Sequence, residues 1–96
     1  MRSYYTWQVF RDVKESQWSA DHIAAHDVTL EEVREAILEH PFWKTAGKND
    51  TVLIYGQTYA GRHLLVVAVD DQGEAFIVTA RDMKLSEKKT FQRKAR

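Results

Sequence analysis

Three short apolar runs in succession, within residues 51–81, constrain the fold of this chain more than any other feature. The runs are rich in the β-branched and aromatic residues that favour strands. Turn residues, including Gly61 and Gly73, separate them at the spacing of consecutive hairpins. The pattern predicts an antiparallel meander with strands near 51–58, 63–70 and 74–80.

The middle run, from Leu64 to Val69, is apolar at successive positions and does not alternate. Strands of this kind usually have both faces covered, so we expect this one to be the central and most buried strand. In the first run, Val52, Ile54 and Gly56 share one face, which we expect to pack under helices.

The clearest helix signal lies just before the meander. Thr29 and Glu32 form a Thr-x-x-Glu capping box, which predicts a helix over 30–40 that Pro41 stops. The polar side of this helix is acidic, because it carries Glu31, Glu32, Glu35 and Glu39.

Two further helices are predicted, one on each side of these elements. A short helix near 20–26 has a capping residue at Ser19 and ends by Asp27, a residue that tolerates a left-handed backbone. A last helix near 85–94 is rich in helix formers, and its expected anchors are Leu85 and Phe91.

The ends of the pattern are less regular. Residues 1–17 form an aromatic extension in which 4–10 can add an edge strand, while 44–50 is expected to be a polar loop. The expected fold class is therefore α+β, in a single domain of residues 1–96. Its sheet is small, twisted and antiparallel, with three to four strands, two helices before it and one after.

Composition excludes several classes of protein. The chain contains no cysteine, which removes disulfides and thiolate zinc sites and is typical of a cytoplasmic protein. No apolar run approaches the roughly 20 residues that cross a bilayer, and residues 1–5 do not open a signal peptide. We therefore expect a cytoplasmic protein with no membrane partner and no cofactor.

The charges are unevenly distributed, although the formal net charge is zero. The segment from Arg81 to the end carries seven basic residues, and only Asp82 and Glu87 oppose them. This excess indicates a basic surface for an anion, whereas the acidic remainder suits a basic partner. A charged last helix that is simply solvated explains the same pattern equally well.

Three motifs resemble the BrnT-like toxins of bacterial type II toxin–antitoxin systems. They are WSADHIAAHDVT at 18–29 followed by Glu32, GQT at 56–58 with Gly61-Arg62, and TARDM at 79–83 with Glu87. The resemblance covers about residues 18–93. It implies a RelE-like ribonuclease fold, an endoribonuclease activity on mRNA, and a small DNA-binding antitoxin encoded by an adjacent gene.

Five positions depart from the pattern of that family. The last strand has Phe76 where an arginine is common, and the last helix opens at Lys84 where Thr is usual. The aromatic residue at Phe91 is usually Tyr, Asp27 replaces Gly, and Ala25 replaces a basic residue. Two functions therefore stay open: a ribonuclease, or a catalytically inactive binding module that docks an antitoxin or self-associates as a homodimer.

Arg62 and Arg81 are the candidate catalytic cations, because a guanidinium group holds a phosphate in a two-pronged contact and stays charged. Such groups stabilise the phosphorane-like transition state of metal-independent RNA cleavage. The two arginines are expected at the same end of the sheet. Lys84, Lys88, Lys89 and Arg93 are the expected RNA-binding residues. Arg81 can alternatively form a structural ion pair with Glu87.

His22 and His26 are four residues apart on a predicted helix, so they are expected to share one face. This spacing suits a metal ion or proton transfer, but no cysteine or carboxylate triad completes a metal site, and none is predicted. His26 is kept as a catalytic candidate beside a packing or capping role. Glu87 is the fourth catalytic candidate, with capping of the last helix as its alternative.

Overall fold

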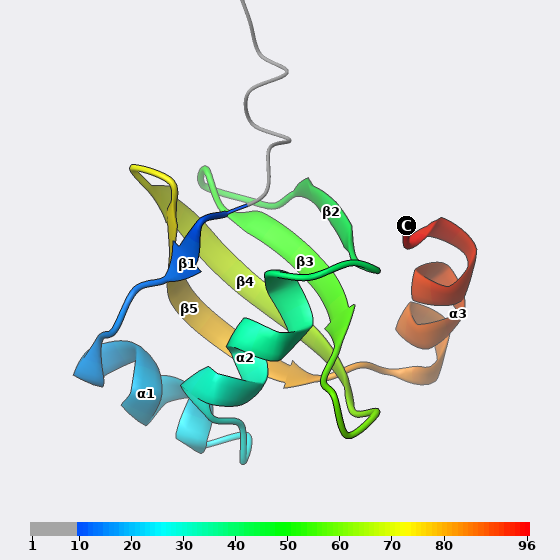
Figure 1. Ribbon diagram of the computed structural model, residues 1–96, viewed down its shortest axis with the longest axis horizontal. Helices are drawn as coiled ribbons and strands as arrows, with labels where there is room; N and C mark the ends of the chain where they lie inside the picture. Colours follow the sequence, from blue (N-terminus) through cyan, green and yellow to red (C-terminus); the bar gives the residue numbers. More distant parts are fainter. Residues whose placement is uncertain (1–9) are drawn as a thin grey trace, which may run out of the picture.

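A five-stranded mixed sheet is the centre of the fold in the computed structural model, which describes residues 10–96 (Figure 1). The protein is α+β, as predicted. Its elements in chain order are β1 Asp12–Val13, α1 Gln17–Ala24, α2 Leu30–Ile37, β2 Trp43–Ala46, β3 Val52–Gln57, β4 His63–Asp71, β5 Glu74–Asp82 and α3 Leu85–Lys94.

The predicted meander is confirmed, because β3, β4 and β5 are antiparallel neighbours close to the expected bounds. The strand order is β1-β5-β4-β3-β2, so β4 is central. The sheet has five strands where three to four were predicted, because two short strands join the meander, one at each edge. Residues 43–46, assigned in part to a loop, form β2 beside β3, and Asp12–Val13 pairs in parallel with β5. The predicted edge strand at 4–10 lies outside the described residues except for Phe10.

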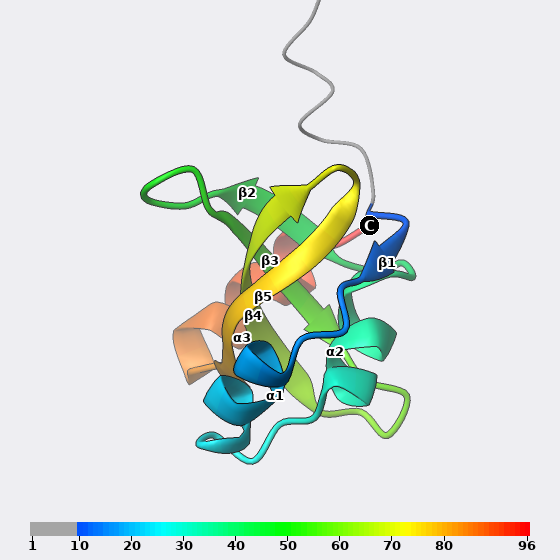
Figure 2. The same ribbon diagram turned by 90° about the vertical axis from the view of Figure 1, so that its left-hand side faces the viewer.

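The two faces of the sheet have different cover. The covered face carries Ile54, Leu64, Val66 and Ile77, and helices α1 and α2 pack on it. Figure 2 shows α2 and α3 on opposite sides of the sheet. On the opposite side, which we call the open face, α3 covers Leu65 at one end while Leu53, Val67, Val69, Phe76 and Thr79 stay partly exposed. The expectation that both faces of β4 are covered is therefore met on one face only.

Helix α2 begins as the capping box predicts. The Thr29 Oγ1 accepts a hydrogen bond from the Glu32 N–H at 3.1 Å, and Glu32 accepts one from the Thr29 N–H at 3.0 Å. The helix ends at Ile37, before Pro41 can act on it. It lies against Gly56 of β3, where an added Cβ would come within 1.9 Å of the Ala36 carbonyl oxygen. A glycine is therefore required at this contact.

Helix α1 starts and ends earlier than predicted. Its N-cap is Ser16, whose Oγ accepts a hydrogen bond from the Ser19 N–H at 3.2 Å. Ser19 is instead fully buried, and its hydroxyl donates to the Ile77 carbonyl oxygen of β5 at 2.7 Å. The chain then turns at Asp27, which has the expected left-handed backbone with φ of 59°.

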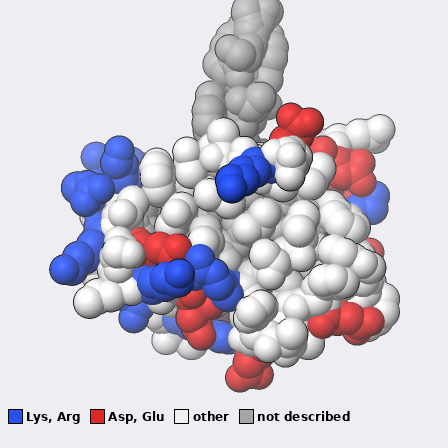
Figure 3. Space-filling view, turned by 180° about the vertical axis from the view of Figure 1, so that it is seen from behind, with Lys and Arg blue, Asp and Glu red and all other residues white. Residues whose placement is uncertain are grey.

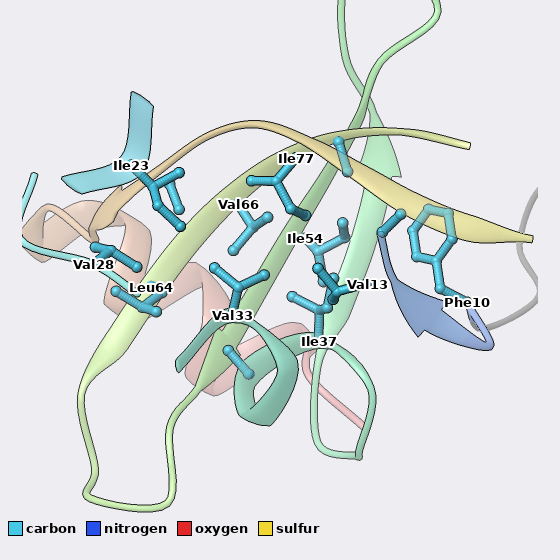
Figure 4. Close-up of a cluster of buried hydrophobic side chains, with 14 of the residues drawn as sticks. Phe10, Val13, Ile23, Val28, Val33, Ile37, Ile54, Leu64, Val66 and Ile77 are labelled. Carbon is cyan, nitrogen blue, oxygen red and sulfur yellow. The ribbon is translucent and has the colours of Figure 1, made fainter. Parts of the chain in front are cut away.

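The main core lies between the covered face and helices α1 and α2. Figure 4 shows aliphatic side chains from both layers meeting there, among them Ile23, Val33, Ile54 and Val66. A smaller cluster of Leu65, Met83 and Phe91 holds α3 on the open face. The predicted second anchor of α3 was wrong, since Leu85 is 70% exposed. Among residues 10–96, no helix is long and apolar enough to cross a membrane.

Candidate active site on the open face of the sheet

Arg81 and Glu87 form a two-pronged ion pair on the open face. The guanidinium nitrogens of Arg81 donate to the two carboxylate oxygens of Glu87 at 2.8 and 2.9 Å. Arg81 lies opposite Leu65 in the strand register, which places it on this face. The pair is partly accessible, with a third of the Arg81 side chain exposed. Arg81 therefore forms the ion pair with Glu87 that the sequence analysis gave as the alternative to a catalytic role.

Glu87 has a second role at the start of α3. Its carboxylate accepts a hydrogen bond from the Lys84 N–H at 2.8 Å, so the predicted capping contact is also present. The hydrogen bond from Arg81 lowers the pKa of Glu87, and the one from the Lys84 backbone acts in the same direction. Glu87 is consequently a carboxylate at neutral pH.

Tyr55 belongs to the same cluster and was missed by the sequence analysis. It lies opposite Leu65 from the β3 side, so Tyr55 and Arg81 flank that leucine on the open face. Burial raises the pKa of the Tyr55 phenol, and the charge of Glu87 raises it further. The phenol is therefore neutral at physiological pH and can donate a hydrogen bond. Ile54, the residue before it, was predicted to face the helices. Because successive strand residues point to opposite faces, this was the signal that could have placed Tyr55 on the other face.

Arg62 is held in a separate network on the covered side of the sheet. Its guanidinium donates to Asp82 at 2.7 Å, to the Asp27 carbonyl oxygen at 2.7 Å and to Glu32 at 3.2 Å. The hydrogen bond from Arg62 lowers the pKa of Asp82. Arg62 therefore ties the β3–β4 hairpin to β5 and to the segment between α1 and α2.

The two candidate arginines lie at the same end of the sheet, as expected, but on opposite faces. Asp82, the partner of Arg62, faces Leu64 in the register, whereas Arg81 faces Leu65. Successive residues of a strand point to opposite faces. The two guanidinium groups therefore do not converge on one phosphate in this structure.

The histidines do not share a helical face, because α1 ends at Ala24 and His26 lies in the turn that follows. The backbone oxygen of His26 accepts a hydrogen bond from Arg62 at 3.3 Å. His22 stacks on Trp18 with ring centroids 3.6 Å apart. Within residues 10–96, no group of three or more histidine, aspartate or glutamate side chains is arranged to hold a metal ion.

The predicted RNA-binding residues lie on or next to α3, beside the Arg81–Glu87 pair. Lys84, Lys89 and Arg93 are exposed and Lys88 is partly exposed. Figure 3 shows Lys and Arg atoms gathered at one side of the face opposite α2, next to a broad area in which most atoms are uncharged. Lys94 lies over the Trp43 ring at 5.5 Å from its centroid, which extends the cationic edge toward β2.

The comparisons with known proteins add no identification, because no protein family, no curated protein and no solved structure matches the chain.

Proposed function

We propose that this protein is the toxin of a type II toxin–antitoxin pair and a metal-independent endoribonuclease that acts on mRNA. The three BrnT-like motifs support the family, and one observation supports the site. Arg81 and Glu87, a cation and a carboxylate 2.8 Å apart, lie on an open sheet face beside a helix rich in lysine. A phosphodiester can reach both groups there.

The proposed chemistry uses only side chains of this cluster. The RNA 2′-oxygen attacks the adjacent phosphorus, the bond from phosphorus to the 5′-oxygen breaks, and the products are a 2′,3′-cyclic phosphate and a 5′-hydroxyl. Glu87 accepts the proton of the 2′-hydroxyl, and water supplies a proton to the leaving oxygen. Arg81 moves from Glu87 to the phosphate oxygens and stabilises the charge that develops on them. Tyr55 supplies a neutral hydrogen-bond donor at the same place.

Substitution of each arginine tests the assignment. Arg81→Ala should lower the rate of RNA cleavage by about 10²–10³, the usual cost of one charge-stabilising donor. Arg62→Ala is the matched control, since it removes the same group from the other face and should lower the melting temperature without a comparable loss of cleavage per folded molecule. Cleavage is measured with and without ribosomes. Equal rates for wild type and Arg81→Ala would remove Arg81 from the mechanism.

A catalytically inactive binding module is the second candidate. This hypothesis is favoured because Arg81 is the one candidate catalytic arginine that lies on the open face of the described residues. On the same face, Phe76 stands where the BrnT-like pattern commonly has an arginine. This alternative predicts that expression of the wild-type protein alone does not arrest growth. It also predicts stable co-purification with the product of a neighbouring gene.

The proposed partner in both cases is a basic, DNA-binding antitoxin. The exposed side of α2 carries Glu31 and Glu35, and Glu39 follows just after the helix; Glu35 accepts a hydrogen bond from the Tyr59 N–H at 3.1 Å. The Tyr59 hydroxyl also donates to Glu39. An acidic surface of this kind should bind a basic protein with a strong salt dependence. Purification of this protein alone from its native operon at low salt would exclude the partner.

A further inference from the structure

Three aromatic rings form a stack at the edge of the open face. The Trp18 ring lies 3.6 Å from the His22 ring and 5.5 Å from the Phe76 ring, with interplanar angles of 27° and 25°. Trp18 and His22 come from α1, whereas Phe76 comes from β5. We call these three residues the aromatic strip.

Trp18 and His22 of the aromatic strip are exposed, unlike the phenylalanine rings of the core. Trp18 is 47% exposed, whereas Phe10, Phe42 and Phe91 are each less than a tenth exposed. Phe76 lies opposite Val69 on the open face and is itself only partly covered. Stacking on His22 and Phe76 covers part of the indole, so the strip offers the exposed remainder of the Trp18 ring and the exposed His22 ring as aromatic surface next to the sheet.

The strip and the Arg81–Glu87 pair lie along the same strand. Phe76 is opposite Val69 and Arg81 is opposite Leu65, so four residues of β4 separate them. At about 3.3 Å per strand residue this is a separation of roughly 13 Å. Thr79, on the same face, lies between them and adds a hydroxyl group. The basic residues of α3 continue the row beyond Arg81.

We propose that single-stranded RNA lies along β5, with an unpaired base on the aromatic strip and a phosphate at Arg81. This inference rests on the proposed function, because it names how the substrate is held. Aromatic platforms beside cationic groups are how proteins bind single strands with little sequence preference, since every base has a flat face to stack. The cations on this face favour a polyanion over a protein segment as the ligand.

The test uses a 2′-O-methyl RNA octamer of mixed sequence, which lacks the attacking hydroxyl and therefore binds without being cleaved. Affinity is measured by fluorescence anisotropy for wild type, Trp18→Ala, Phe76→Ala and Trp18→Phe. We expect Trp18→Ala to weaken binding about 10-fold, the scale of one lost base stack, and Trp18→Phe to retain most of the affinity. Tyr59→Ala is the matched control: Tyr59 is a 70% exposed aromatic residue that contacts the acidic side of α2, and its loss should change nothing.

A second probe separates stacking from charge. An abasic octamer with the same sugar–phosphate backbone should bind wild type and Trp18→Ala equally. A melting curve confirms that each variant is folded. The inference is overturned if Trp18→Ala binds the mixed octamer as tightly as wild type, if the loss is equal for the abasic probe, or if wild type binds neither. It is also overturned if Trp18→Ala changes only the oligomeric state, since the strip is then a protein interface.

The outcomes also separate this inference from the proposed function. RNA cleavage by the wild type, combined with unchanged octamer binding by Trp18→Ala, retains the nuclease and removes the aromatic strip. Trp18-dependent binding without cleavage, with or without ribosomes, retains the strip and removes the nuclease.

Discussion

Phe76 and Arg81 lie on the same face of the sheet although they are five residues apart on one strand. An odd separation on a regular strand places two side chains on opposite faces. Here Val67 pairs with Thr79 while the next residue, Ala68, pairs with Ile77, so Val78 is an extra residue in β5. This bulge shifts the alternation by one residue. The aromatic strip and the candidate active site consequently share the open face.

Gly56→Ala should destabilise the protein strongly. The added Cβ would lie 1.9 Å from the Ala36 carbonyl oxygen, so α2 must move away from the sheet. We expect a loss of at least 1–3 kcal/mol, the order of an overpacked core site. Gly47→Ala is the comparison and should cost less, because its Cβ would meet only side-chain atoms of Thr51 and Leu53 and no backbone atom of another element. Chemical denaturation measures both, and similar losses in the two variants would contradict the contact.

Ser19→Ala should also cost stability, for a different reason. The Ser19 hydroxyl is fully buried and donates to the Ile77 carbonyl oxygen, which loses this partner in the variant. An unsatisfied buried acceptor costs about 1–3 kcal/mol. Ser86, exposed on α3, provides the control substitution Ser86→Ala. Equal free energies of unfolding for the two variants would show that water replaces the lost hydrogen bond.

Arg62→Ala should lower the free energy of unfolding by about 1.5–3 kcal/mol, the range for hydrogen bonds to charged groups. The variant leaves Glu32 and Asp82 without their cation and separates the hairpin from the α1–α2 turn. For a domain of this size the melting temperature falls roughly 4–8 °C per kcal/mol. Lys89 is an exposed cation on α3, and the control substitution Lys89→Ala should leave the melting temperature unchanged. A wild-type melting temperature in Arg62→Ala would contradict the structural role.

The contribution of Glu87 to stability should depend on pH. Arg81 lowers the pKa of Glu87 in the folded protein, so the folded state binds its proton less readily than the unfolded state. The stabilisation from the ion pair is fully present above the pKa of Glu87 in the unfolded state, about 4.3. It is lost as pH falls through the lower pKa that Glu87 has in the folded state. Melting temperatures of wild type and Glu87→Gln should therefore differ at pH 7 and converge as Glu87 becomes protonated in acid. A constant difference across this range would refute the ionic contribution.

Binding of single-stranded RNA should weaken as salt rises, because each neutralised phosphate releases condensed counterion. Replacing Lys88 and Lys89 by Gln should lower the slope of log K against log salt by about 0.7 for each lost phosphate contact. Lys48→Gln, in the β2–β3 turn and away from α3, is the matched control and should keep the wild-type slope. An unchanged slope in the double variant would show that the helix is only a solvated charged surface.

Local sequence determined most of the secondary structure. The meander of β3, β4 and β5 follows from strand-forming runs and turn residues, and α2 begins where its capping box lies. The turn at Asp27 was also recognisable, because a left-handed conformation restricts the residue type. These features depend on interactions among near neighbours in the chain, which a sequence pattern records directly.

Tertiary structure decided the short strands and the site. Strands β1 and β2 are too short to show an alternation, and they exist because β5 and β3 offer free hydrogen-bonding edges. The bulge at Val78 arises from the pairing of β5 with β4, and it alone brings Phe76 to the face of Arg81. The opposite placement of Arg62 and Arg81 likewise depends on strand register. A register joins residues distant in the chain, so the order of amino acids does not reveal it.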